Sequence, residues 1–226
     1  MITSVIFDID GTLVDSVDLH ARAWQETFQH FGYEFPFDEI RHQIGKGSDK
    51  LVPHFISKQE VERIGEKLDK FRGELWKTKY FDDVKPFPKV RDLFQRILAD
   101  GKKIALASSA KGEDLKKYKK IAAIDDLVDK ETSSDDVENS KPDPDIVHAA
   151  LQKLHNPDPM QVVMIGDTPY DAEAARKAGV QVIGVLCGGF PKQELIESGA
   201  AQIFRDPAHI LAHYDESLLG KKAQAA

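Results

Sequence analysis

The chain has 226 residues, of which 41% are hydrophobic and 31% are charged, and its formal net charge is −7. This composition is ordinary for a globular protein with a sizeable core, and the negative charge argues against a general attraction to nucleic acid or anionic membranes. The length suits one large domain, or a core domain with a smaller insertion.

Neither the ends nor the interior of the chain predict export or membrane insertion. The N-terminus enters an apolar run without the basic flank of a signal peptide, and no apolar stretch reaches the length of a membrane-spanning helix. The one cysteine, Cys187, excludes an internal disulfide and fits a reducing compartment. We therefore expect a cytoplasmic protein in which Cys187 is a small buried residue rather than a redox switch.

Four short apolar runs predict buried parallel strands. In chain order these runs are residues 4–7, 103–107, 162–165 and 180–185. A weaker strand is expected within residues 128–134. Helical spacing is found over residues 90–98, 146–154 and 169–178. Strands that alternate with helices predict an α/β fold with a doubly wound, Rossmann-like parallel sheet.

The segment after the first strand departs from this alternation. From about residue 15 to 83 we find helical patterns and no convincing strand. The first pattern is an apolar stripe at helical spacing, and further helices are predicted over residues 37–44, 49–56 and 59–79. We predict a helical domain over 15–83, with hinges near 15–16 and 82–83. It would be inserted into a core domain formed by 1–14 and 84–220, and 221–226 would be a frayed tail.

Polar residues, many of them carboxylates, follow the predicted strands or, in the case of Lys141, precede a predicted helix. They are Asp8, Asp10, Thr12, Ser108, Ser109, Lys141, Asp167 and Asp171. Ligands of an open parallel sheet bind beyond the carboxyl ends of its strands, so we expect these loops to share one cavity. Clustered carboxylates repel one another unless a cation is present, and Mg²⁺ typically uses one or two carboxylates with phosphate and water. The pattern therefore predicts a magnesium-dependent reaction of a phosphoryl group.

The residue types also indicate chemical roles. Asp8 and Asp10 are two positions apart, so one can attack while the other exchanges a proton with the ester oxygen. The hydroxyl of Ser108 and nearby backbone N–H groups can hold phosphoryl oxygens, and a lysine lets the anionic nucleophile approach. Gly11 allows the sharp turn beside the two aspartates.

Four motifs, in this order and at this spacing, resemble those of the haloacid dehalogenase-like hydrolase superfamily across roughly residues 3–210. They are Asp8-Ile9-Asp10-Gly11-Thr12, Ser108, Lys141 and Gly166-Asp167-Thr168-Pro169-Tyr170-Asp171. The resemblance implies that Asp8 forms an aspartyl-phosphate and that Asp10 protonates the leaving oxygen and later activates water. It also implies that phosphate is contacted from Thr12, Ser108, Ser109 and Lys141. Mg²⁺ would be held by Asp8, Asp167 and the backbone carbonyl of Asp10, with Asp171 assisting directly or from a second layer.

Each of these residues also has a purely structural interpretation. Asp8 and Asp10 could belong to an ordinary Asp-Gly turn, and Lys141 could be a solvated loop residue. Ser108 and Asp167 could cap the helices that follow them, and Asp171 could be a first-turn acid. We interpret Asp143 and Asp145 as residues of a helix start.

The inserted helices resemble the small helical cap of this superfamily, which excludes water and selects the leaving group. Gly45-Lys46-Gly47-Ser48 resembles the loop that some caps dip into the cavity; alternatively, it is a turn in which Ser48 caps the next helix. It is not a Walker A loop, because Ile40 stands where that motif requires glycine. His20 resembles a cap histidine of sugar phosphomutases, or is a partly buried structural residue.

We predict a phosphomonoester phosphatase acting on a small soluble metabolite, as a monomer or weak homo-oligomer, without nucleic-acid or membrane partners. Dehalogenation is disfavoured because the dehalogenases lack the second aspartate, which is present here as Asp10. The rival enzyme is a phosphomutase resembling β-phosphoglucomutase, supported by the sequence around His20 and opposed by Thr12 and Gly166. A receiver-type phospho-switch is a third alternative, and both the insertion and Asp10 oppose it.

Overall fold

The computed structural model describes residues 1–128 and 130–220. The predicted tail, residues 221–226, lies outside these ranges. Within them, no helix combines the length and the apolar character that crossing a membrane demands.

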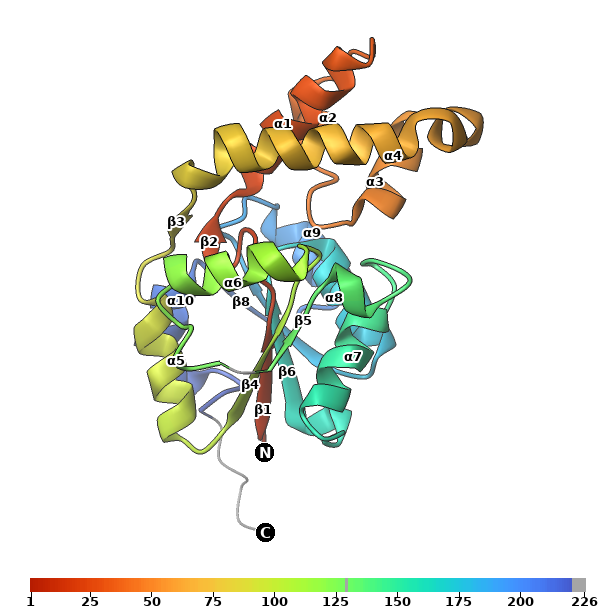
Figure 1. Cartoon of the computed structure of the whole chain (residues 1–226). Coiled ribbons are helices and arrows are strands. Elements are labelled where there is room, and N and C mark those ends of the chain that lie inside the picture. The colour runs from red at the N-terminus through yellow and green to blue at the C-terminus, as the bar shows by residue number, and fades with distance from the viewer. Residues whose placement is uncertain (129, 221–226) are drawn as a thin grey trace.

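A six-stranded parallel sheet in the order β5-β4-β1-β6-β7-β8 forms the centre of the protein (Figure 1). The strands are β1 (Ser4–Phe7), β4 (Lys103–Ala107), β5 (Glu131–Thr132), β6 (Val162–Gly166), β7 (Gln181–Val185) and β8 (Gln202–Phe204). Phe7 of β1 is aligned with Leu106 and Ile165 of its two neighbours. The loops that follow these strands therefore leave the sheet at one edge. The predicted α/β fold with a doubly wound parallel sheet is confirmed.

Helices cover both faces of the sheet, because alternate side chains of each strand point to opposite faces. One apolar cluster joins Val5 and Phe7 of β1 to α5 (Val90–Ala99), α6 (Gly112–Ile121) and α10 (Pro207–Ala212). A second cluster joins Ile6 to α7 (Asp145–Lys153) and α8 (Pro169–Lys177). The short helix α9 (Lys192–Glu197) contacts α8 and β8.

Residues 17–83, here called the helical region, lie beyond the carboxyl ends of the strands (Figure 1). Its helices are α1 (Val17–His30), α2 (Phe37–Arg41), α3 (Ser48–Phe55) and α4 (Lys58–Leu75). They enclose an apolar cluster of their own, which includes Trp24, Phe28 and Leu68. A π-helical turn (Trp76–Tyr80) and a 3₁₀ turn (Phe81–Asp83) lead back to the sheet, and Trp76 packs in the first core cluster.

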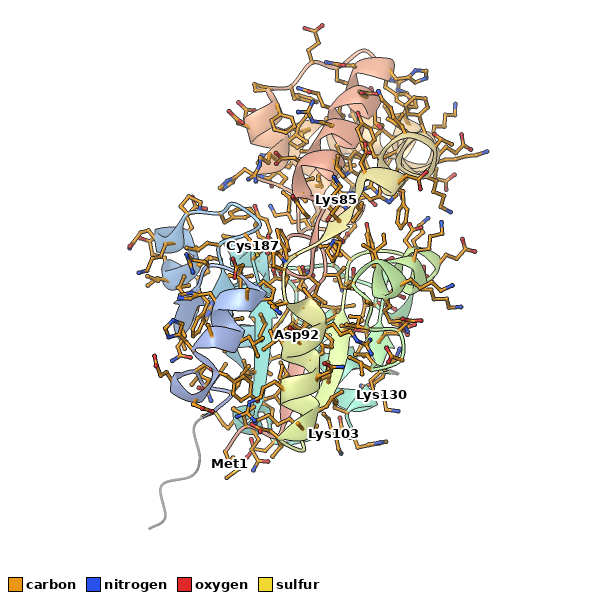
Figure 2. The ribbon with its side chains drawn as sticks, turned by 90° about the vertical axis from the view of Figure 1, so that its left-hand side faces the viewer. Met1, Lys85, Asp92, Lys103, Lys130 and Cys187 are labelled. Atoms are coloured by element: carbon orange, nitrogen blue, oxygen red, sulfur yellow. The ribbon has the colours of Figure 1, made fainter. Side chains whose placement is uncertain are left out.

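A two-stranded antiparallel ribbon joins the helical region to the rest of the chain. Val14 of β2 (Val14–Asp15) pairs with Pro86 of β3 (Lys85–Pro86), and Asp15 pairs with Lys85. Figure 2 shows Lys85 and Cys187 at the end of the sheet nearest the helical region, and Met1 and Lys103 at the opposite end. The ribbon lies close to the hinges predicted near 15–16 and 82–83, but it was not itself predicted.

Several predicted bounds differ from the structure. The helix expected over 37–44 ends at Arg41, before Gly45 with its positive φ of 110°. The helix expected over 59–79 is α-helical only to Leu75. The weak strand within 128–134 is limited to Glu131–Thr132, and the last predicted strand starts at Gln181 rather than at residue 180. Strand β8 was not predicted, because its three residues are too few to show an alternating pattern.

Candidate active site

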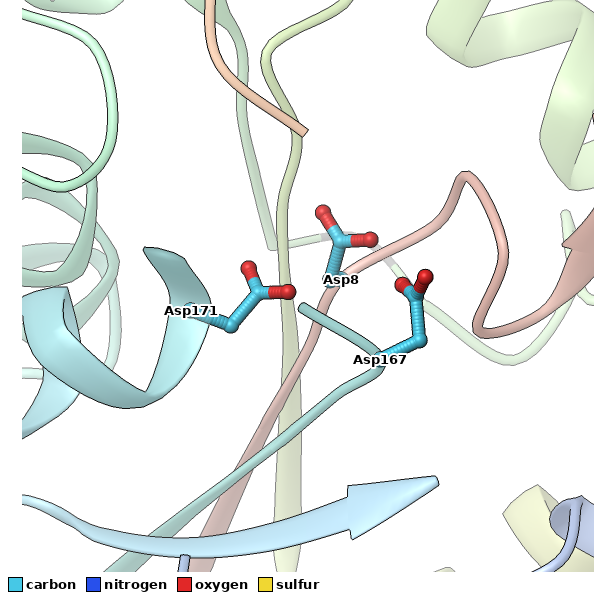
Figure 3. A group of neighbouring side chains, drawn as sticks. All are labelled: Asp8, Asp167 and Asp171. Carbon is cyan, nitrogen blue, oxygen red and sulfur yellow. The ribbon is translucent and has the colours of Figure 1, made fainter. Parts of the chain in front are cut away.

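Three carboxylates converge where β1 and β6 end (Figure 3). Asp8 follows β1, Asp167 follows β6 and Asp171 lies in the first turn of α8. One oxygen atom from each lies within 4.8 Å of the other two. All three side chains are buried, with exposures of 4% for Asp8 and 0% for Asp167 and Asp171. The register of β1 with β6 brings these loops together, and the backbone N–H of Asp8 donates to the carbonyl of Ile165 at 2.9 Å.

Lys141 is a buried cation between two of these carboxylates. Its Nζ donates to Asp8 Oδ1 at 2.6 Å and to Asp171 Oδ1 at 2.7 Å, and the residue is 1% exposed. Burial alone would lower the pKa of Lys141, but the charges of Asp171 and Asp8 outweigh it and raise this pKa. The interpretation of Lys141 as a solvated loop residue is therefore wrong.

Asp171 has both of its oxygens engaged. While Oδ1 accepts from Lys141, Oδ2 accepts from the backbone N–H and the hydroxyl of Thr168, and that hydroxyl accepts from the N–H of Asp171. Thr168 and Asp171 thus form the capping box of α8, with Pro169 in the first turn. The interpretation of Asp167 as the cap of this helix is wrong. Asp171 does lie in the first turn, but its bond to Lys141 means that a purely structural interpretation is incomplete.

Asp167 is the least satisfied member of the group. Its Oδ1 accepts from the hydroxyl of Thr12 at 2.9 Å, whereas its buried Oδ2 has no hydrogen-bond partner among the described residues. Burial, followed by the charges of Asp8 and Asp171, raises the pKa of Asp167 well above its usual value. The hydroxyl of Thr12 was predicted to contact phosphate; in the structure it is committed to Asp167.

Opposing effects also determine the pKa of Asp8. Burial and the charges of Asp171 and Asp10 raise the pKa of Asp8 to about 7, although Lys141 acts in the opposite direction. A hard divalent cation with oxygen ligands would remove this repulsion and would satisfy the orphan Oδ2 of Asp167. The donor set therefore fits Mg²⁺. Within 1–128 and 130–220, this is the one group of three or more such side chains placed to share an ion.

The carboxylate of Asp10 is not part of this group. It points to the start of the helical region and accepts hydrogen bonds there. Its Oδ1 accepts from Ser16 Oγ at 2.6 Å and from His20 Nε2 at 2.9 Å. Arg72 donates to the other ring nitrogen of His20. Because a guanidinium cannot accept a hydrogen bond, Nδ1 of His20 must accept and Nε2 must carry the proton that Asp10 receives. Burial would raise the pKa of Asp10, but His20 and then Ser16 lower it to about 2.

His20 is a buried residue with defined partners on every side. Its ring stacks on Trp76 with 3.7 Å between ring centroids, and Nε2 lies 3.2 Å from the hydroxyl of Tyr118 on α6. The sequence pointed to His20 but not to Arg72 or Tyr118. No pattern marks them, because they lie 52 and 98 positions away from His20 along the chain.

The two serines after β4 have different surroundings. Ser108 is fully buried, and its Oγ accepts from the backbone N–H of Ala110 at 3.1 Å. The residue that precedes α6 is Lys111, so the interpretation of Ser108 as a helix cap is wrong. Ser109 donates from Oγ to the carbonyl of Gly45 in the helical region at 3.3 Å.

The loop of residues 45–47 rests against neighbours of the predicted site residues. The N–H of Gly47 donates to Ser140 Oγ at 3.0 Å, and a Cβ on Gly45 would lie 2.7 Å from Cγ2 of Thr168. Lys46 donates from Nζ to Gln43 at 2.5 Å, and this Nζ lies 4.4 Å from the ring centroid of Tyr170. The N-cap of α3 is Gly47, which has no side chain, and Ser48 is the first residue of the helix, so the interpretation of Ser48 as its cap is wrong.

Comparison with known proteins agrees with this arrangement. Residues 5–185 match the family described as haloacid dehalogenase-like hydrolase, and the chain belongs to this family of enzymes. A relative from Caldanaerobacter subterraneus subsp. tengcongensis that carries the pyrophosphatase name PpaX is 32% identical over 192 residues, 84% of each chain. The phosphorylated carbohydrates phosphatase of Thermotoga maritima is 28% identical over 92% of this chain and 96% of its own.

Solved structures show the same fold. The crystal structure of a hydrolase from Pseudomonas syringae superposes with a TM-score of 0.83 at 29% identity, covering 95% of this chain and 98% of that one. The suspected superfamily is thereby confirmed.

Proposed function

We propose that this protein is a magnesium-dependent phosphatase that releases inorganic phosphate from small phosphate esters, with Asp8 as its nucleophile. One observation carries the proposal: a buried lysine bonded to Asp8 lies near Asp167, whose Oδ2 has no hydrogen-bond partner within residues 1–128 and 130–220. Lys141 favours the ionised form of Asp8 and fixes one of its oxygens. The names of the relatives from Caldanaerobacter and Thermotoga support phosphate-ester or pyrophosphate chemistry.

The reaction would have two steps on the protein's own side chains. A carboxylate oxygen of Asp8 forms a bond to phosphorus while the bond from phosphorus to the ester oxygen breaks, and Asp10 gives that oxygen a proton. In the second step Asp10 takes a proton from the water that hydrolyses the aspartyl-phosphate. The arrangement seen here, in which His20 keeps Asp10 ionised, suits this second step.

The proposed metal ligands are Asp8, Asp167 and the backbone carbonyl of Asp10. Bound Mg²⁺ would neutralise charge, so that an anionic nucleophile can meet an anionic phosphoryl group. Asp171 would act from a second layer, because its oxygens already hold Lys141 and Thr168. Ser108, Ser109 and Lys141 are the proposed phosphate contacts, whereas Thr12 would orient Asp167.

We also propose that residues 15–83 act as a cap domain on a core formed by residues 1–14 and 84–220. A cap above the carboxylates would limit the substrate to small molecules and exclude water during the attack. Lys46 would meet the leaving group at the edge of the site, beside Tyr170. The proposed setting is the cytoplasm, with a monomer or weak homo-oligomer and no nucleic-acid or membrane partner.

The test is a phosphate-release screen of the purified full chain with Mg²⁺ or with a chelator. The panel would contain sugar phosphates, nucleotides, phosphoglycolate and pyrophosphate, with Asp8→Asn as the matched control. We expect release that requires Mg²⁺ and is absent from the variant. Release that survives in Asp8→Asn would exclude Asp8 as the nucleophile, and no release from any substrate by the wild type would count against a phosphatase.

A sugar phosphomutase is the second candidate, and the hydrogen bond from His20 to Asp10 is the observation that favours it. His20 lies in the helical region and bonds to the carboxylate of Asp10, which transfers the proton. It would thereby favour a sugar hydroxyl over water as the group that Asp10 activates. Conversion of one sugar phosphate isomer into another, dependent on a bisphosphate primer and without net phosphate release, would replace the phosphatase proposal with this one.

A further inference from the structure

The free oxygen of Asp167 is confined by two glycines. A Cβ on Gly11 or on Gly188 would overlap Oδ2 of Asp167, so the backbone approaches this atom closely from two loops. Cys187 connects the two loops, because its Sγ lies 3.2 Å from the carbonyl oxygen of Gly11 and donates to it. Any movement of residues 187–189 therefore changes the space in which the Asp167 carboxylate can turn.

The same loop is held from its other side by the helical region. Arg41, the last residue of α2, donates from Nη2 to the carbonyl of Gly188 at 2.9 Å. Its Nε donates to Asp18 Oδ1 on α1 at 2.7 Å, which fixes the guanidinium to the helical region. A Cβ on Gly189 would overlap this guanidinium, so arginine and loop are in close contact.

We propose that Arg41 is a positioning residue for the metal site, and that it couples docking of the helical region to cation affinity. With the helical region docked, Arg41 presses residues 187–189 against Asp167 and keeps Oδ2 directed at the ion. By thermodynamic linkage, cation binding must then strengthen docking by the same factor. This inference rests on the proposed function only in taking Asp167 as a magnesium ligand.

The geometry that Mg²⁺ requires makes such an indirect contact effective. Mg²⁺ demands nearly ideal octahedral geometry at about 2.0–2.1 Å, so a small rotation of a carboxylate is costly. The hydroxyl of Thr12 fixes one oxygen of Asp167, and the glycine loop is what limits the other. Partners that orient metal ligands are typically worth about 10- to 100-fold in affinity. Because Arg41 acts through the backbone of Gly188, we expect the low end of this range.

The experiment measures Mg²⁺ affinity by calorimetry on the full chain without substrate. Arg41→Met keeps the length of the side chain and removes its donors, and it should raise the Kd about tenfold. Arg41→Lys keeps the positive charge but cannot contact Gly188 and Asp18 at the same time, so its Kd should lie between those of the wild type and Arg41→Met. Arg63→Met is the matched control, because this exposed arginine of α4 bonds to Glu60 within the helical region. It should bind Mg²⁺ like the wild type.

A second measurement separates positioning from a general loss of stability. Mg²⁺ should slow backbone hydrogen exchange over residues 41–47 in the wild type and should do so much less in Arg41→Met. Gly188→Ala, which intrudes on Asp167 directly, should weaken Mg²⁺ binding more than either arginine variant.

Equal Mg²⁺ affinity in Arg41→Met and wild type would overturn the inference. The inference would also be overturned if Arg41→Met lowered the melting temperature by the same amount with and without Mg²⁺, because that result would mean a purely structural role for Arg41. In both cases Mg²⁺-dependent phosphate release by the wild type would leave the proposed function intact. A wild-type chain that binds no Mg²⁺ would refute both.

Discussion

The carboxylate–lysine cluster at the strand ends differs from the exposed ion pairs Lys50–Asp143 and His42–Glu194, here called the junction, which link the rim of the helical region to the rest of the protein. In the cluster, the side chains of Lys141, Asp8 and Asp171 are at most 5% exposed. In the junction, Lys50 and Asp143 are 2.9 Å apart and both are 35% exposed. His42 and Glu194 are 50% and 37% exposed.

This difference separates a rigid part from a reversible one. Removing one partner of a buried ion pair typically costs about 3–5 kcal/mol, whereas an exposed pair contributes about 0–1 kcal/mol. The carboxylates are thus fixed by a few strong contacts that break at high cost. The exposed pairs of the junction are weak and can open without unfolding the protein, whereas the base of the helical region is buried, because His20 bonds to Asp10 and Trp76 packs in the first core cluster. Under the proposed cap role, exposed pairs of this kind would let the rim open to admit substrate and release phosphate.

The strongest test of the rigid part is Asp8→Asn. This variant lacks an anionic nucleophile, so we expect phosphate release to fall by at least about 10⁴-fold, in line with the loss of other enzymic nucleophiles. Far-ultraviolet circular dichroism should remain that of the wild type, because the amide keeps the shape of the side chain. Activity within about tenfold of the wild type would contradict the proposed chemistry.

Asp10→Asn should have the next largest effect. General acid–base groups contribute about 10²- to 10⁴-fold, and loss of the base should slow breakdown of the aspartyl-phosphate. Mass spectrometry of the acid-quenched variant should then show a phosphorylated chain. An unchanged rate, with no such species, would remove Asp10 from the mechanism.

Lys141→Met and Lys50→Met form a matched pair across the two regions. The first leaves Asp8 and Asp171 buried without their cation and should destabilise the fold by about 3–5 kcal/mol at neutral pH. The second breaks one exposed contact of the junction and should cost less than about 1 kcal/mol. Urea unfolding of both variants measures the difference, and equal losses would mean that the two regions do not differ as described.

Asp167→Asn tests whether function is maintained here at the expense of stability. A folded-state pKa above the unfolded value means that this carboxyl stabilises the fold at low pH, and that its contribution is lost as pH rises. At neutral pH in a chelator, the amide should therefore raise the melting temperature, by about 2–4 °C if the gain is about 1 kcal/mol.

Added Mg²⁺ provides the control for that variant. It should raise the melting temperature of the wild type by mass action and leave Asp167→Asn unchanged. A variant that is less stable than the wild type in the chelator would mean that Asp167 is adequately compensated without an ion.

Lys50→Met also gives the smallest functional effect that we expect. Because the pair of Lys50 with Asp143 is partly exposed, its loss should shift the equilibrium between open and closed forms only slightly. We therefore expect kcat to change by less than about fivefold and Mg²⁺ affinity to stay the same. Steady-state kinetics at saturating Mg²⁺ measures this. A fall in kcat as large as that expected for Asp10→Asn would contradict the view that this contact is weak.

The parts of the site that sequence reasoning could reach are those attached to strands. Asp8 and Asp167 each end a short apolar run, and a parallel register brings such ends together. The capping box of Thr168 and Asp171 also has a readable spacing, although only Asp167 was considered as a possible cap from the sequence. Such features can be read from the sequence because they depend on residues that are close together in the chain.

Contacts across the chain left no such signal. Arg41 meets Gly188 across 147 positions, and Arg72 meets His20 across 52. Their sequence surroundings are those of ordinary helix-surface arginines, so only the folded arrangement reveals a role. Ribbon β2–β3 was missed for another reason, since two residues cannot display an alternating pattern.

That ribbon has a consequence for how such a protein could diversify. The chain leaves the sheet layer at Val14–Asp15 and returns at Lys85–Pro86, directly alongside. The inserted segment, residues 16–84, could be exchanged as one unit by recombination, because its two ends are already paired and the strands of the sheet stay in place. The new insert would have to supply a partner for Asp10 in place of His20, and under the proposed cap role it would change the leaving-group preference while the carboxylates at the strand ends stay the same.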